Sequence, residues 1–254
     1  MSFNVRYPAK SDGANVWENR RDLLVDTIRK HAPDIMGTQE LFHLQGEYIV
    51  AKLPEMAWIG VSRRGNREDE HMGVFYRKDS LELLTSGNFW LSETPDQPGS
   101  ISWNMSLPRM VTWGEFRDKR TKRTFFFYNT HFAHRREDNQ ARVESAKLLA
   151  ERVRKVASGA TVILTGDFNT DAGSDPYRTL TEVLQDSYSA VSAPKGPVGT
   201  FHGFDGTPGK TRIDWILFRG QVKPVSVETI TTNADGRYPS DHFPVLTVFD
   251  WTKQ

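Results

Sequence analysis

Acids, amides and histidines recur in this sequence at the ends of apolar segments, where their side chains could share one site. The clearest case is the segment 163–171, ILTGDFNTD, in which Asp167 and Asn169 follow a glycine after an apolar run. Taken alone, Gly, Asp and Asn after a strand are typical of a turn, because they tolerate left-handed backbone and form local hydrogen bonds. A catalytic loop is the alternative, and the rest of the chain must decide between them.

Comparable residues border most of the other apolar segments. They are Asn4, Glu40, His131, Asp214, Asp241 and His242. Each has an ordinary structural explanation when taken alone, such as a helix-capping role for Glu40 or an ion pair between Asp214 and Arg212. Buried acids are costly unless they are paired or bound to a metal, so convergence of these residues on one site is the simpler explanation for the whole set.

The types of ligand indicate a hard cation and the hydrolysis of a phosphate ester. Glu40, Asp241 and Asn4 offer only oxygen donors, which suit Mg²⁺ or Mn²⁺. Zinc prefers imidazole or thiolate ligands, and the chain contains no cysteine. Histidines and further carboxylates beside such a cation suit attack of water on a phosphate ester, in which a carboxylate accepts the proton and cationic groups bind the growing negative charge.

Helical and strand patterns alternate along the chain and must position these side chains. The predicted helices cover residues 17–31, 44–53, 138–157 and a segment that begins at 175. The predicted strands cover residues 1–7, 34–38, 57–61, 73–77, 110–116, 124–130, 161–165, 213–218, 224–230 and 244–249. Strands outnumber helices, and helices separate groups of strands in both halves. Two sheets packed face to face with helices outside fit this pattern, and an open parallel sheet is the rival.

The bulk composition limits the classes of function. The length and the 37% hydrophobic content suit a single domain over residues 1–254. Lys and Arg number 33 against 32 for Asp and Glu, which disfavours a protein that coats nucleic acid through a wide basic surface. No apolar run reaches the roughly 20 residues that cross a bilayer, so we expect no membrane insertion. No signal peptide is visible, but the first residues read as a strand already under way, so we expect a longer natural product and leave an extracytoplasmic origin open.

Six short segments together resemble the endonuclease/exonuclease/phosphatase superfamily, which includes pancreatic deoxyribonuclease, deadenylases and inositol-polyphosphate phosphatases. In chain order they read SFN, TQE, NTH, GDFN, RIDWIL and SDHFPV, and they span residues 2–249. Any one of them is weak evidence, whereas six in the family's order are specific. The resemblance implies a four-layer α/β/β/α sandwich, with two mixed sheets face to face and helices outside, and a metal-dependent phosphoric ester hydrolase.

The resemblance also implies roles for the acids and amides that match the family's motifs. Glu40 is the expected principal ligand of Mg²⁺ or Mn²⁺, with Asn4 and Asp241 completing or supporting its coordination sphere. Asp167 is expected to orient and deprotonate the attacking water. Asn169 is expected to donate a hydrogen bond to a phosphate oxygen.

Two histidines complete the expected catalytic set. His242 matches the histidine that contacts the scissile phosphate, and Asp214 matches the carboxylate that orients it and favours its charged form. His131 matches the choice of the deoxyribonucleases and sphingomyelinases. The abasic-site endonucleases place a tyrosine at that position, which disfavours an abasic-site substrate.

The residues that would select the substrate are less defined. Further candidates for substrate contact are Arg109, Arg142, His134 and Trp103. Both arginines fit ordinary surface or ion-pair roles equally well, and Trp103 lies in the long segment 86–109, where it could stack on a base or anchor the core. We expect a phosphodiesterase or nuclease-like enzyme that acts on a phosphate ester, with nucleic acid or a nucleotide among the candidates. A lipid-headgroup or inositol-phosphate esterase is the second expectation, a catalytically silent binding module is the third, and the oligomeric state stays open.

Overall fold

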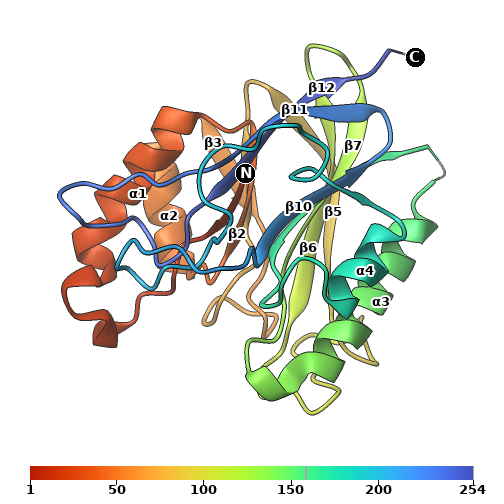
Figure 1. The fold of residues 1–254 in the computed structure, drawn as a ribbon. Helices are drawn as coiled ribbons and strands as arrows, with labels where there is room; N and C mark the ends of the chain where they lie inside the picture. Colours follow the sequence, from red (N-terminus) through yellow and green to blue (C-terminus); the bar gives the residue numbers. More distant parts are fainter. Residues whose placement is uncertain (158, 254) are drawn as a thin grey trace.

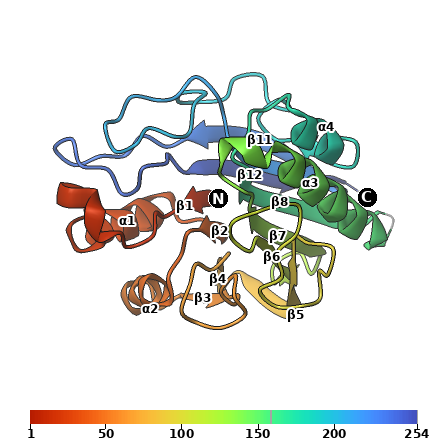
Figure 2. The ribbon, with the colours of Figure 1, turned by 90° about the horizontal axis from the view of Figure 1, so that it is seen from below.

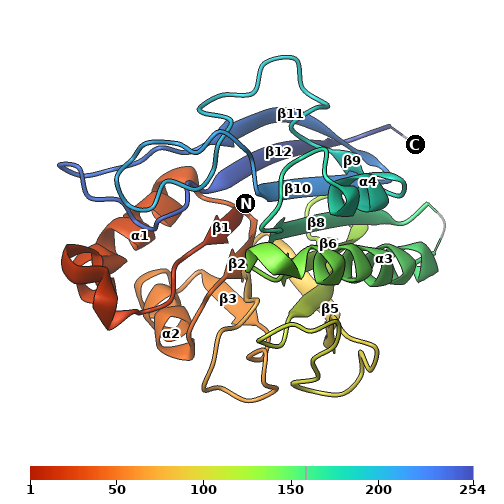
Figure 3. The same cartoon turned by 60° about the horizontal axis from the view of Figure 1, so that its bottom comes forward.

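The computed structural model of this chain describes residues 1–157 and 159–253 and contains two six-stranded sheets packed face to face (Figure 1). Helices cover both outer faces, as the views from below show (Figures 2 and 3). They are α1 (Trp17–His31) and α2 (His43–Lys52) on the first sheet and α3 (Asn139–Lys155) and α4 (Asp175–Thr181) on the second, with short 3-10 turns at Lys10–Asn15 and Arg136–Asp138. The predicted four-layer sandwich is confirmed, and the open parallel sheet is excluded.

The first sheet combines the two ends of the chain. Its strands, in spatial order, are β11 (Val222–Thr229), β12 (Val245–Trp251), β1 (Ser2–Asn4), β2 (Ile35–Gln39), β4 (Val74–Arg77) and β3 (Met56–Ile59). The central pair, β1 and β2, is parallel, and Asn4 lies opposite Gln39 in its register. The carboxyl ends of these two strands therefore lie at the same end of the sandwich.

The second sheet is built from the middle of the chain. Its strands, in spatial order, are β5 (Leu81–Trp90), β6 (Met110–Asp118), β7 (Thr124–His131), β8 (Thr161–Asp167), β10 (Asp214–Arg219) and β9 (Gln185–Asp186). Here β7 and β8 form the parallel pair, with His131 opposite Asp167. Both sheets thus present the ends of a parallel pair, and those ends carry the polar residues singled out in the sequence.

Apolar periodicity explains why the helices lie where they do. In α1 the side chains of Leu24, Val25 and Ile28 are buried against the first sheet, and in α3 those of Leu149 and Val153 are buried against the second. Burial of each such side chain contributes roughly 1.5–3 kcal/mol relative to exposure. The space between the sheets is filled by a third apolar cluster that includes Phe116, Phe127 and Ile216.

Several strands differ from the sequence prediction. β8 continues two residues beyond 165, so Asp167 is the last residue of the strand and does not follow it. β7 likewise includes His131. The ten-residue strand β5 is absent from the predicted strands, because a register shift between Leu83 and Thr85 interrupts its alternation of inward and outward side chains.

Other interpretations of single residues and loops are settled by the fold. The basic segment 119–123 forms the turn between β6 and β7. Trp90 is a buried anchor whose indole N–H donates to the carbonyl of Arg63 at 2.6 Å. None of the helices in residues 1–157 and 159–253 is long and apolar enough to cross a membrane.

Hydrogen bonds join the two sheets next to the strand ends. The side-chain amide of Asn129, on β7, donates to the carbonyls of Thr38 (2.7 Å) and Gly73 (3.0 Å) in the first sheet. Its oxygen accepts from Gln39 Nε2 at 2.7 Å. Gly37 permits this close approach, because a Cβ there would lie 2.5 Å from the side-chain oxygen of Asn129. The separation of the sheets is therefore fixed beside the strand ends.

A cavity of about 500 Å³ lies between the sheets at the opposite end, where β2 and β5 begin. Its walls include Ile35, Leu81 and Trp251. None of the catalytic residues predicted from the sequence lines it within the described chain, so cavity size does not locate the chemistry in this molecule.

Candidate active site

Asp167 is the centre of the polar cluster at the strand ends. Its Oδ2 atom accepts from Asn4 Nδ2 at 2.9 Å and lies 3.5 Å from His131 Nε2 and 3.8 Å from His242 Nε2. The side chain is 1% exposed. Three of these residues come from different strands, and His242 precedes a fourth, so the fold brings together residues that lie 238 positions apart in the chain.

His242 and Asp214 form a hydrogen-bonded pair. His242 Nδ1 lies 2.9 Å from Asp214 Oδ2, so the ring directs Nε2 toward Asp167. Burial by itself would lower the pKa of His242, but the charges of Asp214 and Asp167 outweigh it and hold that pKa well above its usual value. These neighbours therefore favour the protonated form of the imidazole. The ion pair that the sequence left open between Asp214 and Arg212 is not formed, because Arg212 pairs with Asp186.

The pKa of Asp167 is raised to about 7, by burial first and then by the charge of Asp214. The charge of His242 and the hydrogen bond from Asn4 oppose that rise. A carboxylate with a pKa near neutrality suits a general base, since it can accept a proton and release it again at neutral pH.

Turn chemistry and site chemistry coincide at Asn169. Its backbone N–H donates to Asp167 Oδ1 at 3.0 Å, and its φ of 50° is left-handed. This is the local hydrogen bonding that a turn would use. The turn holds the amide nitrogen 2.9 Å from His131 Nε2 and 3.1 Å from the carbonyl of Phe132. The turn interpretation is confirmed, and the turn places the amide beside His131, while a catalytic role for the segment stays a prediction.

Glu40 follows β2 in a left-handed conformation with a φ of 58°. Its carboxylate accepts from Asn4 Nδ2 at 3.1 Å and from the backbone N–H of Tyr7 at 3.2 Å. Asp241 is a neighbouring acid: burial raises the pKa of Asp241, and the charge of Glu40 raises it further. A non-glycine residue in this backbone region is strained, and such strain is common where a side chain must be aimed into a site.

The oxygen donors of Glu40 and Asp241 fit a hard divalent cation. The guanidinium of Arg6 is the nearest positive charge to both, at 3.9 Å from Glu40 Oε2 and 3.8 Å from Asp241 Oδ2. A second set of ligand atoms, from Asp167, Asp214 and His242, lies within 4.8 Å of one another. A hard cation prefers oxygen donors, which Glu40 and Asp241 supply alone, whereas the second set includes an imidazole, so the pair of carboxylates is the better fit.

Asn4 does not present the oxygen that its predicted role as a metal ligand requires. Its Oδ1 accepts from the backbone N–H of Arg6 at 3.0 Å, and its nitrogen faces Glu40 and Asp167. Asn4 therefore links the proposed cation ligand to the proposed base. Of the two roles predicted for Asn4, support of the Glu40 coordination sphere fits these contacts, and direct ligation through its oxygen does not.

His131 is buried and neutral. Burial lowers its pKa well below the usual value, and the neighbouring charges of Arg109 and His242 lower it further. Its Nδ1 lies 3.9 Å from Glu70 Oε2, and Glu70 in turn pairs with Arg63 at 2.8 Å. His131 therefore serves as an uncharged hydrogen-bonding group rather than as a cation.

The sequence analysis missed Glu70 and Arg63. The segment 66–71, NREDEH, resembles an exposed charged loop, yet Glu70 is buried and its pKa is raised to about 7 by that burial, against the charges of Arg109 and Arg63. The sequence does indicate Glu70, because it closely precedes the apolar segment of β4. Its position beside an apolar segment is the property by which the other acids were selected.

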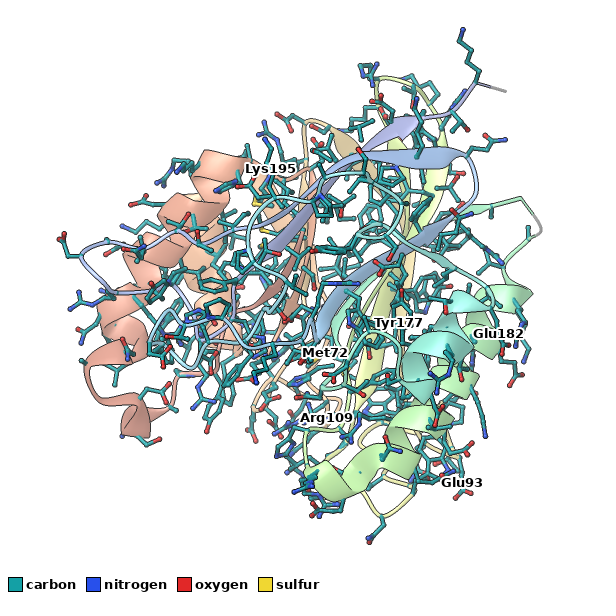
Figure 4. The ribbon with its side chains drawn as sticks, viewed as in Figure 1. Met72, Glu93, Arg109, Tyr177, Glu182 and Lys195 are labelled. Carbon is teal, nitrogen blue, oxygen red and sulfur yellow. The ribbon has the colours of Figure 1, made fainter. Side chains whose placement is uncertain are left out.

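Arg109 lies close to these charges. It is buried at the start of β6, at the lower end of the sandwich in Figure 4. Its Nη2 lies 2.9 Å from His134 Nδ1, and its Nη1 has no hydrogen-bond partner among the described residues. Burial lowers the pKa of Arg109, whereas Glu70, Glu40 and Asp167 raise it. Its predicted contact with a phosphate fits this free donor.

Arg142 and Trp103, unlike Arg109, do not present free groups to the site. Arg142 Nη1 donates to the carbonyls of Ala133 and Arg135, each at 2.8 Å, so its guanidinium supports the loop after β7 and is not directed at the site. Trp103 packs against the cluster of Met105, Ala133 and Ala141, which favours its role as an anchor over that of a stacking platform.

Comparisons with family models and with solved structures identify the same protein family. The sequence matches the model described as Endonuclease/Exonuclease/phosphatase family over residues 1–242. Among solved structures, a Bacteroides thetaiotaomicron protein described as belonging to that family is 36% identical, with a TM-score of 0.92 over 98% of this chain and 95% of that one. A Bacteroides thetaiotaomicron mannosyl-6-phosphatase is also 36% identical, with a TM-score of 0.92 over 98% of each chain.

A solved structure of lower sequence identity shows the fold alone. The human Nocturnin catalytic domain is 19% identical, with a TM-score of 0.77 over 98% of this chain and 91% of that one. Among curated proteins, the uncharacterised protein L388 of Acanthamoeba polyphaga mimivirus is 34% identical over 61% of this chain. This chain spans about 60% of the length of that protein and about 35% of another mimivirus protein, R895.

Proposed function

Because the chain belongs to the Endonuclease/Exonuclease/phosphatase family, we propose that it is a phosphoric ester hydrolase in which a water molecule deprotonated by Asp167 attacks the phosphorus of the substrate. The observation that carries this proposal is the position of Asp167 Oδ2, within 2.9–3.8 Å of Asn4, His131 and His242. A base, a neutral hydrogen-bonding group and a protonated histidine thus meet at one point.

The roles of the residues follow from their charges. Asp167 accepts the proton of water as the new oxygen–phosphorus bond forms. Negative charge then grows on the phosphate oxygens, and the protonated His242 binds it more strongly in the transition state than in the ground state. Asp214 holds the His242 ring in position, and Asn169 would donate to a phosphate oxygen in place of its present contact with His131 Nε2.

Glu40 and Asp241 would hold the divalent cation that this family's chemistry implies. When bound, Mg²⁺ or Mn²⁺ supplies positive charge to the phosphate and lowers the pKa of a bound water. Arg6, at 3.8–3.9 Å from their oxygens, offsets part of the negative charge of the two carboxylates. Asn4 fixes the position of Glu40 relative to Asp167.

A phosphorylated sugar is the substrate class that the comparisons support best. The neighbour named a mannosyl-6-phosphatase is 36% identical over 98% of both chains, whereas Nocturnin, at 19%, gives no support beyond the fold. The near-neutral net charge of +1 also offers no wide basic surface for nucleic acid. The phosphodiesterase or nuclease-like activity expected from the sequence motifs is the second candidate.

A side-by-side assay tests both candidates. Purified protein would be incubated with mannose 6-phosphate, bis-p-nitrophenyl phosphate or single-stranded DNA, in Mg²⁺, Mn²⁺ or EDTA. We expect metal-dependent release of phosphate from the sugar ester that exceeds hydrolysis of the diester and the DNA. Asp167→Asn should abolish that release, while Asp171→Asn, which changes an exposed acid four residues later, should not. Metal-independent turnover, or none on any ester, would contradict the proposal and favour a binding module.

A further inference from the structure

An exposed aromatic side chain, Phe201, lies directly beside the protonated histidine of the site. Its ring centroid is 5.1 Å from that of His242, with the two planes 66° apart. The side chain is 46% exposed, whereas its neighbours Thr200 and His202 are buried. Single exposed apolar residues are common on protein surfaces, so exposure alone carries no conclusion.

The backbone around Phe201 is fixed from both sides. Phe201 and His242 form an isolated antiparallel bridge. The backbone N–H of Phe243 donates to the carbonyl of Thr200 at 2.7 Å, and the backbone N–H of His202 donates to the backbone carbonyl of Asp241 at 2.9 Å. The carbonyl of Phe201 also accepts from the N–H of Gly209 at 2.8 Å. The ring is therefore presented outward by an ordered segment.

Residues 200 and 202 point inward and stabilise that presentation. Thr200 Oγ1 accepts from the backbone N–H groups of Ile213 and Asp214, both at 3.2 Å, which ties the segment to the residue that orients His242. The ring of His202 stacks on Phe243, with centroids 4.0 Å apart. Because alternate residues of an extended segment face opposite sides, Phe201 must face away from this support.

We infer that Phe201 is a specificity-determining platform that packs against the ring of the group esterified to the phosphate. This inference rests on the proposed function, since it assigns the phosphate to His242 and the leaving group to the adjacent rim. A phosphate bound at Nε2 of His242 leaves its ester group to pass over that rim, where Phe201 offers a flat apolar surface. Substrates should carry a pyranose ring or a nucleobase, both of which present a face that an aromatic ring can cover.

The expected effect follows from the strength of such stacking. Removal of an aromatic side chain that stacks on a ring costs on the order of a tenfold to hundredfold loss of affinity, as measured for bases stacked on aromatic residues. Phe201→Ala should therefore raise KM for a ring-bearing ester by roughly tenfold or more while kcat changes by less than about threefold. Phe201→Trp, which retains a flat aromatic face, should restore most of the affinity.

The experiment compares mannose 6-phosphate, adenosine 5′-monophosphate and glycerol 3-phosphate, the last of which has no ring. The predicted signature is a loss in kcat/KM for Phe201→Ala that is at least about tenfold greater on a ring ester than on glycerol 3-phosphate, which corresponds to about 1.4 kcal/mol of selective binding. Whether the sugar or the nucleotide shows the larger loss identifies the kind of ring. Val198→Ala, at a 52% exposed position on the same loop, is the matched control and should show no such selectivity.

Two results would overturn the inference. Equal losses on all three esters would show that Phe201 acts only by holding His242 in place. No loss on any ester would show that the ring has no role in binding. If wild-type protein hydrolysed none of the esters, the proposed function would fail by itself, and calorimetric titration of wild type and Phe201→Ala with mannose 6-phosphate and the nucleotide would still decide the question. Equal affinities of the two proteins, or no measurable binding, would then refute the platform.

Discussion

Asp167 and His242 lie close together in one buried site, yet their surroundings suit Asp167 to accept a proton and His242 to carry a positive charge. Burial and the charge of Asp214 raise the pKa of Asp167 to about 7, so this carboxylate can exchange a proton at neutral pH. The same acids keep His242 protonated despite its burial. Two titratable groups with such different proton affinities can serve as a base and a charge-stabilising group in one step.

The pH dependence of kcat/KM should report both groups. Asp167 must be ionised, so activity should rise with pH with a midpoint at about pH 7, or at a lower pH when a bound cation lowers the pKa of Asp167. His242 must be protonated, so activity should fall only well above the usual histidine pKa of about 6.5. Asp214→Asn removes the largest charge that raises the His242 pKa, and the alkaline limb should move to lower pH. An unmoved limb would remove His242 from the mechanism, and Asp171→Asn serves as the unshifted reference.

Replacement of Asp167 by asparagine tests the base directly. The amide has nearly the same shape but cannot accept the proton of water, so kcat should fall roughly a hundredfold or more. KM should change much less, because the groups assigned to phosphate binding remain. Steady-state kinetics on mannose 6-phosphate, with circular dichroism as a folding control, would show this. Near-wild-type turnover in the folded variant would refute the mechanism.

Sequence reasoning located most of the candidate site because it relied on residue type and position at strand ends. Asp167, Asn169 and His242 were placed in one cluster before any geometry was known, and the structure brings them together. It could not tell which atom of Asn4 faces the acids, since that depends on a hydrogen bond to the backbone of Arg6. Nor could it tell that Arg142 supports a loop, because a sequence does not show which carbonyls a guanidinium reaches.

Within the strands, the contact between the sheets depends on Asn129. Its side chain makes hydrogen bonds to Thr38, Gly73, Gln39 and Thr165. Asn129→Ala would leave these buried groups without partners, so we expect a loss of about 3 kcal/mol or more in the free energy of unfolding. Urea denaturation would measure it, with Asn233→Ala as an exposed control expected within about 0.5 kcal/mol of wild type. A small effect at Asn129 would mean that the apolar layers alone set the separation of the sheets.

The regular elements were predictable to the extent that local periodicity reports burial. The helix at residues 17–31 has the bounds that its apolar spacing predicted, since Ala32 ends it in a left-handed conformation before Pro33. β5 was not predicted, because its bulge and its exposed residues remove the alternation of apolar and polar side chains that identifies a strand. β9 has only two residues and exists through its pairing with β10, which no local pattern encodes.

For the molecule as a whole, a ligand in this site should act as a link between the sheets. Glu40 and Asp241 flank strands of the first sheet, whereas His131 and Asp167 end strands of the second. Mn²⁺ with inorganic phosphate, each at about 100 times its dissociation constant, should stabilise the fold by roughly 2.7 kcal/mol per independent ligand. Differential scanning fluorimetry should show a rise in Tm, and Glu40→Gln should lose most of the part due to Mn²⁺. An unchanged rise in that variant would exclude Glu40 as a cation ligand.

The strands of the second sheet are all synthesised before the last two strands of the first sheet. The second sheet is complete once residue 219 has left the ribosome, but the first still lacks β11 and β12, and β12 is the strand that pairs with β1. Asp241 and His242 arrive at the same late stage, immediately before β12. A chain that ends before residue 241 lacks both Asp241 and His242. It therefore lacks one of the two carboxylates assigned to the cation and the histidine assigned to the phosphate, so under the proposed mechanism such a fragment should have no hydrolytic activity.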